Sequence, residues 1–324
     1  RFEFDDHKSK QFELFSPECD FTDDSVMTLA VAKALTQYDE ITDYDEFKKY
    51  LVKMMHAVGG KYMGCGYGGR FYMWLKYTCI EPYNSYGNGS AMRASPVAWF
   101  ASSLEECEKL AAATAEVTHN HPEGIKGAVS VAGAVYLART GHTIDEIKEY
   151  VSRFYTVDFT LDEIREAYEF EVSCQKSVPQ AFEAFFESTD FEDTIRNAIS
   201  IGGDSDTIAA IAGSIAHAYY GIDEDTKETL NPNLIQFLKY AISKKEFTFT
   251  ISEMVSKLNL FITPPVLGKL IASNKEELEK LGLFIECKRT QTERLYAAKY
   301  KEPLEILTND IFSVLIIMKY ILRK

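Results

Sequence analysis

Residues 202–221 read GGDSDTIAAIAGSIAHAYYG, and this stretch indicates the fold class most directly. Two glycines and an acidic, hydroxyl-containing turn lead into a long run of alanine, isoleucine and other small residues. Small residues occupy almost every face of the predicted helix 208–220, so we expect neighbouring helices to pack closely around it. Gly221 then follows the run, as glycine commonly does at a helix C-terminus. The stretch therefore predicts the central helix of a helical bundle.

Helical periodicity extends outward from this stretch over most of the chain. Strand-like alternation is limited to a weak run at residues 247–251. Apolar spacing and capping residues predict further helices at 21–35, 45–57, 91–100, 104–118, 122–138, 162–170, 181–187 and 193–200.

The character of the chain changes after residue 222. From about Asn231 onward, lysine- and glutamate-rich patterns continue without a motif, with a break at Pro264 and Pro265. We therefore predict a first domain of residues 1–222 and a helical C-terminal extension, residues 223–324, of unknown role.

Composition restricts the kind of ligand. The net charge is -14 and the sequence pI is about 5.0, which argues against a general nucleic-acid binder and against binding to anionic membranes. A phosphorylated small molecule would have to be held locally, by backbone N–H groups, an arginine or metal ions. The six cysteines are scattered, so we expect reduced thiols. No apolar run is long enough to span a bilayer, and a cytoplasmic location is expected.

Two short acidic clusters, Thr22-Asp23-Asp24 and Asp204-Ser205-Asp206-Thr207, each stand at the start of an apolar helix. One interpretation is ordinary N-capping, which stabilises a helix by roughly 1 kcal/mol. The other is a metal site, because crowded carboxylates repel one another unless a cation neutralises them. Carboxylate and hydroxyl oxygens suit Mg²⁺ or Mn²⁺ better than zinc.

Two glycine-rich loops, 64–69 and 87–89, and a histidine-containing helix break supply further candidates. The glycines allow backbone N–H groups to approach a diphosphate, and Arg93 could add a positive charge; the alternative is tight turns. His119 and His121 are either capping or core histidines, or contacts to a phosphate or a ribose hydroxyl.

Five segments resemble, in order, the signatures of the ADP-ribosylglycohydrolase family. They are CDFTDDSVM at 19–27, GYGGR at 66–70, SYGNGSAMR at 85–93, THNHPE at 118–123 and GGDSDT at 202–207. The resemblance covers about residues 1–222. It implies an all-α fold, a compact orthogonal helical bundle. It also implies hydrolysis of the N- or O-glycosidic bond between ADP-ribose and its acceptor.

The resemblance further implies a binuclear centre of two Mg²⁺ or Mn²⁺ ions. The implied ligands are Thr22, Asp23, Asp24, Asp204, Asp206 and Thr207. Glu3, at the end of what resembles the family's first motif, is a candidate ligand and catalytic carboxylate, together with Asp204 and Asp206. The sequence begins at Arg1, and we expect the helix that usually precedes this motif to be missing from it.

The same matching implies a ligand-binding surface for ADP-ribose and an ADP-ribosylated substrate. Its residues are Gly66, Tyr67, Gly68, Ser85, Tyr86, Gly87, Asn88, Gly89, Ser90, Met92, Arg93 and His119. No membrane partner is expected, nucleic acid is expected only as an ADP-ribosylated substrate, and a monomer is expected.

Two other functions fit parts of the pattern. A catalytically silent ADP-ribose-binding protein on the same fold would need a damaged ligand set, but the clustered ligands are all present. A phosphatase or nuclease with two metals would explain the acidic clusters, but neither the 86–93 loop nor the His119 motif. The acceptor linkage (arginine, serine, O-acetyl, nucleic acid or polymer) is undetermined by the sequence.

Overall fold

The computed structural model describes residues 6–14, 20–41, 43–221, 240–241, 244, 246–258, 264–273, 275–280, 283–289 and 294–300. The chain divides into two compact units, one from Arg1 to Asp223 and one from Glu224 to Leu322. Each unit has its own set of elements and is described by itself.

In the described residues of the first unit, the regular elements are all helices. One isolated β-bridge joins Gly87 and Ser173. This confirms the predicted all-α fold for the part of the chain that carries the motifs. The elements are α1 (Asp23–Leu35), η1 (Tyr38–Glu40), α2 (Tyr44–Gly59), α3 (Gly69–Lys76), η2 (Asn88–Ser90), α4 (Ser95–Phe100), α5 (Leu104–Glu116), α6 (Pro122–Arg139), α7 (Ile144–Ser152), α8 (Leu161–Ile164), α9 (Cys174–Phe186), α10 (Phe191–Ser200) and α11 (Ser205–Tyr220).

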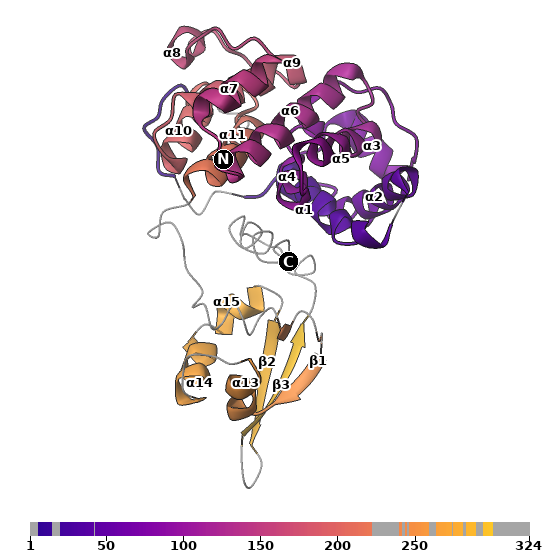
Figure 1. The fold of residues 1–324 in the computed structure, drawn as a ribbon, viewed down its shortest axis with the longest axis vertical. Helices are drawn as coiled ribbons and strands as arrows, with labels where there is room; N and C mark the ends of the chain where they lie inside the picture. Colours follow the sequence, from indigo (N-terminus) through magenta and orange to yellow (C-terminus); the bar gives the residue numbers. More distant parts are fainter. Residues whose placement is uncertain are drawn as a thin grey trace. The chain divides into compact units, whose positions relative to one another are not determined.

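Helices α6 and α11 form the centre of this unit. Helix α11 packs against α10, α9 and α6, and α6 packs in addition against α4, α5 and α7 (Figure 1). Ile208, Ile211 and Ile215 of α11 are fully buried. The small residues between them let the surrounding helices approach closely, as the sequence predicted. Gly221, at φ 78°, ends the helix.

A glycine in α6 sets the distance to α7. A Cβ atom added at Gly133 would lie 1.9 Å from the hydroxyl oxygen of Tyr150. That hydroxyl is held in place by two acceptors for its hydrogen, Glu108 Oε1 at 3.0 Å and the Val129 carbonyl at 3.3 Å. The Tyr150 ring therefore cannot give way without breaking both hydrogen bonds.

We expect Gly133→Ala to lower the free energy of unfolding by about 1–3 kcal/mol through overpacking. Urea unfolding followed by circular dichroism measures the change. Gly69→Ala is the matched control, because nothing lies within 4 Å of its added Cβ atom. An equal loss in both variants would show that the Tyr150 contact is not the cause.

The second unit corrects the prediction of a purely helical C-terminal extension. Its elements are β1 (Glu246–Phe249), α13 (Ile251–Lys257), α14 (Pro264–Ser273), α15 (Lys275–Lys280), β2 (Leu283–Arg289) and β3 (Arg294–Tyr300). The strands form an antiparallel sheet in the order β1-β3-β2. The weak alternating run at 247–251 lies at strand β1 and the start of α13.

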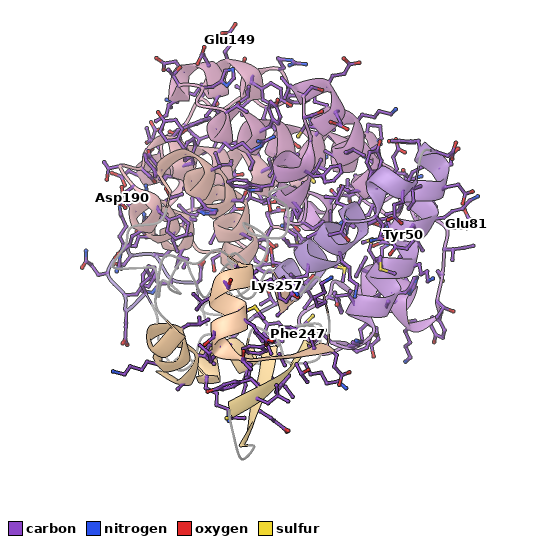
Figure 2. The ribbon with its side chains drawn as sticks, turned by 60° about the horizontal axis from the view of Figure 1, so that its bottom comes forward. Tyr50, Glu81, Glu149, Asp190, Phe247 and Lys257 are labelled. Atoms are coloured by element: carbon purple, nitrogen blue, oxygen red, sulfur yellow. The ribbon has the colours of Figure 1, made fainter. Side chains whose placement is uncertain are left out.

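The sheet escaped prediction because its outer face is charged. Leu283 of β2 and Ala298 of β3 are buried, whereas Glu286 of β2 and Lys299 of β3 are exposed. Exposed lysine and glutamate residues are also typical of helix surfaces. Without a turn signal between the strands, the sequence pattern therefore does not distinguish a strand from a helix. A core of Phe249, Met254, Leu267 and other apolar residues covers one face of the sheet, with Phe247 packed at its edge (Figure 2).

Among the described residues, no helix has the length and apolar character needed to cross a membrane. Each cysteine in the same residues is a free thiol.

Candidate metal centre and ligand loops

The two acidic clusters meet where α1 and α11 begin. The hydroxyl of Thr207 donates to Asp24 Oδ2 at 3.3 Å, and the hydroxyl of Thr22 donates to the same oxygen at 3.0 Å. Asp24 thus links two segments that lie 183 residues apart in the sequence. The structure therefore brings the predicted ligands of both clusters to one place.

These helix starts differ from the capped helices elsewhere in the unit. Asp43, Ser103 and Asp190 each accept a hydrogen bond from a backbone N–H of the helix that follows. Thr22 and Asp204 stand at the N-cap positions of α1 and α11, yet neither side chain makes a cap hydrogen bond. N-capping alone therefore does not account for the two clusters.

Burial and neighbouring negative charges raise the pKa of two carboxyl groups in the clusters, those of Asp24 and Asp204. Burial, followed by the charges of Asp206, Asp23 and Asp204, raises the pKa of Asp24 well above its ordinary value. Burial and the neighbouring Asp206 raise the pKa of Asp204 to about 8. Without a compensating cation, burial and mutual repulsion therefore disfavour the charged forms of Asp24 and Asp204.

Two buried oxygens at this site lack a partner. Asp24 Oδ1 and Asp206 Oδ1 have no hydrogen-bond partner in the described part of the chain. A buried carboxylate oxygen is costly unless it is hydrogen-bonded or coordinates a metal. Unpaired carboxylate oxygens beside threonine hydroxyls fit a hard divalent cation such as Mg²⁺ or Mn²⁺.

The predicted ligand set combines carboxylate and hydroxyl oxygens. Within the described residues, no group of three His, Cys, Asp or Glu side chains is arranged tightly enough to hold a metal by itself. The predicted ligands also include the hydroxyl groups of Thr22 and Thr207, which are not among these four residue types. Glu3, the remaining candidate, lies outside the described residues.

A segment near the N-terminus holds the loop that presents Asp204. Lys8 Nζ donates to the carbonyls of Tyr168 and Ile201 at 2.5 and 2.7 Å. The Gly203 N–H donates to Asp6 Oδ1 at 3.0 Å. Gly202 and Gly203 both have a φ of 70°, which glycine adopts at little cost. No sequence motif marks this clamp, because its hydrogen bonds from Lys8 go to backbone carbonyls of distant residues.

We expect Lys8→Met to weaken Mn²⁺ binding about 10-fold, as loss of outer-shell support does at metal sites. The long apolar side chain keeps the packing but removes both hydrogen bonds. Lys10→Met is the matched control, since Lys10 instead pairs with Asp193 on α10. Mn²⁺ affinity followed by electron paramagnetic resonance decides the matter: equal affinities in the two variants would show that the clamp does not support the site.

The loop of residues 85–90 runs beside the acidic clusters. Asn88 Nδ2 donates to Asp204 Oδ2 at 2.6 Å, so Asn88 orients a predicted metal ligand. The loop is fixed to the residues before α9, because Asn88 N donates to the Val172 carbonyl and Cys174 N donates to the Tyr86 carbonyl. Tyr86 remains half-exposed, with its ring edge against His121 at a centroid distance of 5.3 Å.

His119 lies against the glycines of this loop. Cβ atoms added at Gly87 and Gly89 would lie 3.5 and 3.3 Å from His119 Nε2. Burial, with smaller effects from Arg93 and Arg70, lowers the pKa of His119 well below its ordinary value. The imidazole is therefore neutral at physiological pH. Gly124 packs against the His119 and Ser85 carbonyls, which ties α6 to the same place.

The loop of residues 64–69 is tied to the first acidic cluster. The backbone N–H of Asp23 donates to the Cys65 carbonyl at 2.8 Å, and the hydroxyl of Tyr67 donates to the Gly59 carbonyl at 3.2 Å. Gly66 and Gly68 are exposed. These predicted ligand residues thus lie next to the predicted metal ligands.

Three of the buried residues of the predicted ligand surface have their contacts within the fold instead. Arg93 is 1% exposed, and its guanidinium donates to the Thr114 carbonyl and the Thr118 hydroxyl. Ser90 donates to the Gly124 carbonyl at 2.7 Å, and Met92 is buried with its sulfur 3.9 Å from Thr207 Oγ1. The expectation that Arg93 adds its charge to a phosphate is therefore corrected: the side chain is buried, and its Nη2 donates to groups of the fold.

Comparisons with known proteins identify the family of the chain. The sequence profile of the ADP-ribosylglycohydrolase family matches residues 2–240. ADP-ribosylhydrolase ARH3 of Homo sapiens is 28% identical over 261 residues, covering 63% of this chain and 72% of that protein.

Two further proteins are similar. The ADP-ribosyl-(dinitrogen reductase) glycohydrolase of Rhodospirillum rubrum is 29% identical over 211 residues, covering 63% of this chain and 70% of that protein. A solved ADP-ribosylglycohydrolase-related protein complex superposes with a TM-score of 0.48 at 24% identity, over 62% of this chain and 71% of that one. By the match of the family profile, the chain belongs to the ADP-ribosylglycohydrolase family, a family of enzymes that hydrolyse ADP-ribose linkages.

Proposed function

We propose that this enzyme releases ADP-ribose from a modified acceptor by cleaving its N- or O-glycosidic bond with the help of two bound Mg²⁺ or Mn²⁺ ions. The observation that carries the proposal is the meeting of the two acidic clusters at Asp24, with buried carboxylate oxygens that lack partners. A site of this kind is unstable without cations and stable with them.

The ions would be held by Thr22, Asp23, Asp24, Asp204, Asp206 and Thr207, with Glu3 as a further candidate. When bound, divalent ions supply charge stabilisation and lower the pKa of a coordinated water. Asn88 orients Asp204 through its side-chain amide, and the clamp of Asp6 and Lys8 fixes the turn before Asp204. These contacts are the outer shell that a metal site needs to keep its ligands in place.

The chain's own residues would bind and orient the substrate. Loops 66–68 and 85–89 border the acidic clusters and would receive the diphosphate and the adenosine. His119, neutral and next to Gly87 and Gly89, would contact a ribose or phosphate oxygen. A carboxylate-rich centre suits the positive charge that develops on the sugar when a glycosidic bond breaks. Glu3 or a ligating aspartate would accept the proton of the attacking water.

A panel of ADP-ribose conjugates tests the proposal and its acceptor linkage together. Peptides carrying ADP-ribose on arginine or serine, O-acetyl-ADP-ribose, ADP-ribosylated DNA ends and poly-ADP-ribose are incubated with enzyme, and free ADP-ribose is measured. We expect release from at least one conjugate with Mg²⁺ or Mn²⁺ and none with EDTA. ADP-ribose binding without any release would instead identify a silent ADP-ribose-binding protein. A cytoplasmic location and a monomeric state stay predictions.

A further inference from the structure

A buried chain of polar groups runs beneath the 87–89 loop and ends on His119. Arg93 Nη2 donates to the Thr114 carbonyl at 2.9 Å and to Thr118 Oγ1 at 2.8 Å. Thr118 Oγ1 lies 2.8 Å from His119 Nδ1. Thr118 is fully buried, and Arg93 and His119 are 1% and 5% exposed. An arginine, a threonine and a histidine thus form one connected network.

The chemistry of Arg93 determines which atom donates and which accepts in each hydrogen bond of this network. A guanidinium can only donate, so Thr118 Oγ1 accepts a hydrogen bond from Arg93. The single hydroxyl hydrogen of Thr118 then needs a separate acceptor. Within the described residues, the acceptor in reach is His119 Nδ1. Nδ1 accepts only when it carries no proton, which leaves the proton of a neutral imidazole on Nε2.

The opposite tautomer of His119, with its proton on Nδ1, is less favourable. If Nδ1 carried the proton, it would donate to Thr118 Oγ1, and the buried hydroxyl hydrogen would lack an acceptor among the described residues. An unmade hydrogen bond of this kind is costly in the interior. The positive guanidinium also polarises the hydroxyl and strengthens it as a donor toward Nδ1.

We propose that Arg93 and Thr118 are positioning residues that hold His119 as its Nε2–H tautomer, so that it presents a fixed N–H donor to an oxygen of the bound ligand. The proposal rests on the proposed function for the identity of that ligand, which is ADP-ribose. It gives Arg93 a role one step removed from the ligand, in place of a direct contact with a phosphate.

The surroundings of Nε2 fit this role. Gly87 and Gly89 face this edge of the ring, where an added Cβ atom would lie 3.5 Å from Nε2 at Gly87 and a tighter 3.3 Å at Gly89. Nε2 has no hydrogen-bond partner among the described residues, whereas Nδ1 is engaged. The acceptor would be a ribose hydroxyl or a phosphate oxygen of the ligand, both of which take a hydrogen bond from a neutral N–H.

The test compares Thr118→Val with the wild-type enzyme. Protein labelled with ¹⁵N-histidine reports the tautomer of His119 by long-range ¹H–¹⁵N NMR, and calorimetry reports the affinity for ADP-ribose. We expect the Nε2–H tautomer in the wild type. In Thr118→Val we expect a mixture of tautomers and an affinity about 10-fold weaker, the size of one hydrogen bond. Thr118→Ser should restore both values.

Thr114→Val is the matched control. Thr114 is also fully buried, one turn earlier in the chain, but its hydroxyl donates to the Ala111 carbonyl and not to the network. It should leave the tautomer and the affinity unchanged. ADP serves as a second probe. If Thr118→Val weakens the binding of ADP-ribose but not of ADP, the acceptor lies on the distal ribose. If it weakens the binding of both, the acceptor lies on the diphosphate.

An Nδ1–H tautomer in the wild-type protein would overturn the proposal, and this needs no variant to fold. So would a Thr118→Val protein with unchanged tautomer and affinity. Failure of the proposed function gives a different pattern. In that case ADP-ribose would not bind to the wild type or would not be released from conjugates, while the tautomer of His119 would still be read directly.

Discussion

Replacing Asp206 with alanine is expected to lower turnover by at least about 100-fold, because a metal-bound centre that loses a ligand loses its geometry. The fold should persist. Asp206 Oδ1 is buried without a partner, and the neighbouring carboxylates Asp24 and Asp204 already repel it. Removing one negative charge from the metal-free cluster should therefore leave the melting temperature unchanged or raise it.

Asp190→Ala is the matched control for this variant. Asp190 also stands at a helix start, but it is an ordinary N-cap whose side chain accepts from Asp193 N at 2.8 Å. Its loss should cost about 0.5–2 kcal/mol of stability and leave turnover intact. Steady-state rates and melting curves of both variants separate the interpretations. Normal turnover in Asp206→Ala with a lower melting temperature would mean that the cluster is only a cap.

Divalent cations are expected to stabilise the folded protein strongly, and more so at higher pH. Burial and Asp206 raise the pKa of Asp204 to about 8 from an ordinary value of 3.8, so the folded state binds more protons than the unfolded state between these values. The stability of the metal-free protein therefore falls as the pH rises from about 4 to about 8. A bound cation removes this loss of stability, because its positive charge neutralises the carboxylates in place of the protons.

Differential scanning fluorimetry at pH 6 and pH 8, with EDTA or with Mg²⁺, measures both effects. At a Mg²⁺ concentration of about 100 times its Kd, the gain should approach roughly 2.7 kcal/mol by mass action. The shift should be larger at pH 8 than at pH 6, and Asp24→Asn should reduce it. A metal-free protein whose melting temperature rises over this pH range would contradict the assigned pKa shifts.

The sequence predicted the helical unit well because its signals are local. Such signals include the glycine after Tyr220, the proline at the start of α6 and the small residues of α11. Each acts on its own helix, and α6 and α11 lie at nearly the expected positions. The chemistry of the acidic clusters was equally readable, because carboxylates and threonines crowded at a helix start are unusual whichever fold contains them.

What the sequence could not give depends on contacts between distant segments. The hydrogen bonds of Lys8 to the Tyr168 and Ile201 carbonyls join residues far apart and involve backbone atoms, so no side-chain pattern marks them. Arg93 lies in a ligand-binding motif, yet only its burial shows that its donors serve Thr114 and Thr118. The sheet of the second unit was hidden by its charged outer face.

The claim that the two acidic clusters form one binuclear centre is tested most directly by anomalous diffraction from crystals of the full chain soaked in Mn²⁺. We expect two manganese peaks about 3.5–4 Å apart, between the start of α1 and the start of α11, each within coordination distance of Asp24, Asp204 or Asp206. A map with no peak there, or with manganese bound only elsewhere on this acidic protein, would contradict the claim.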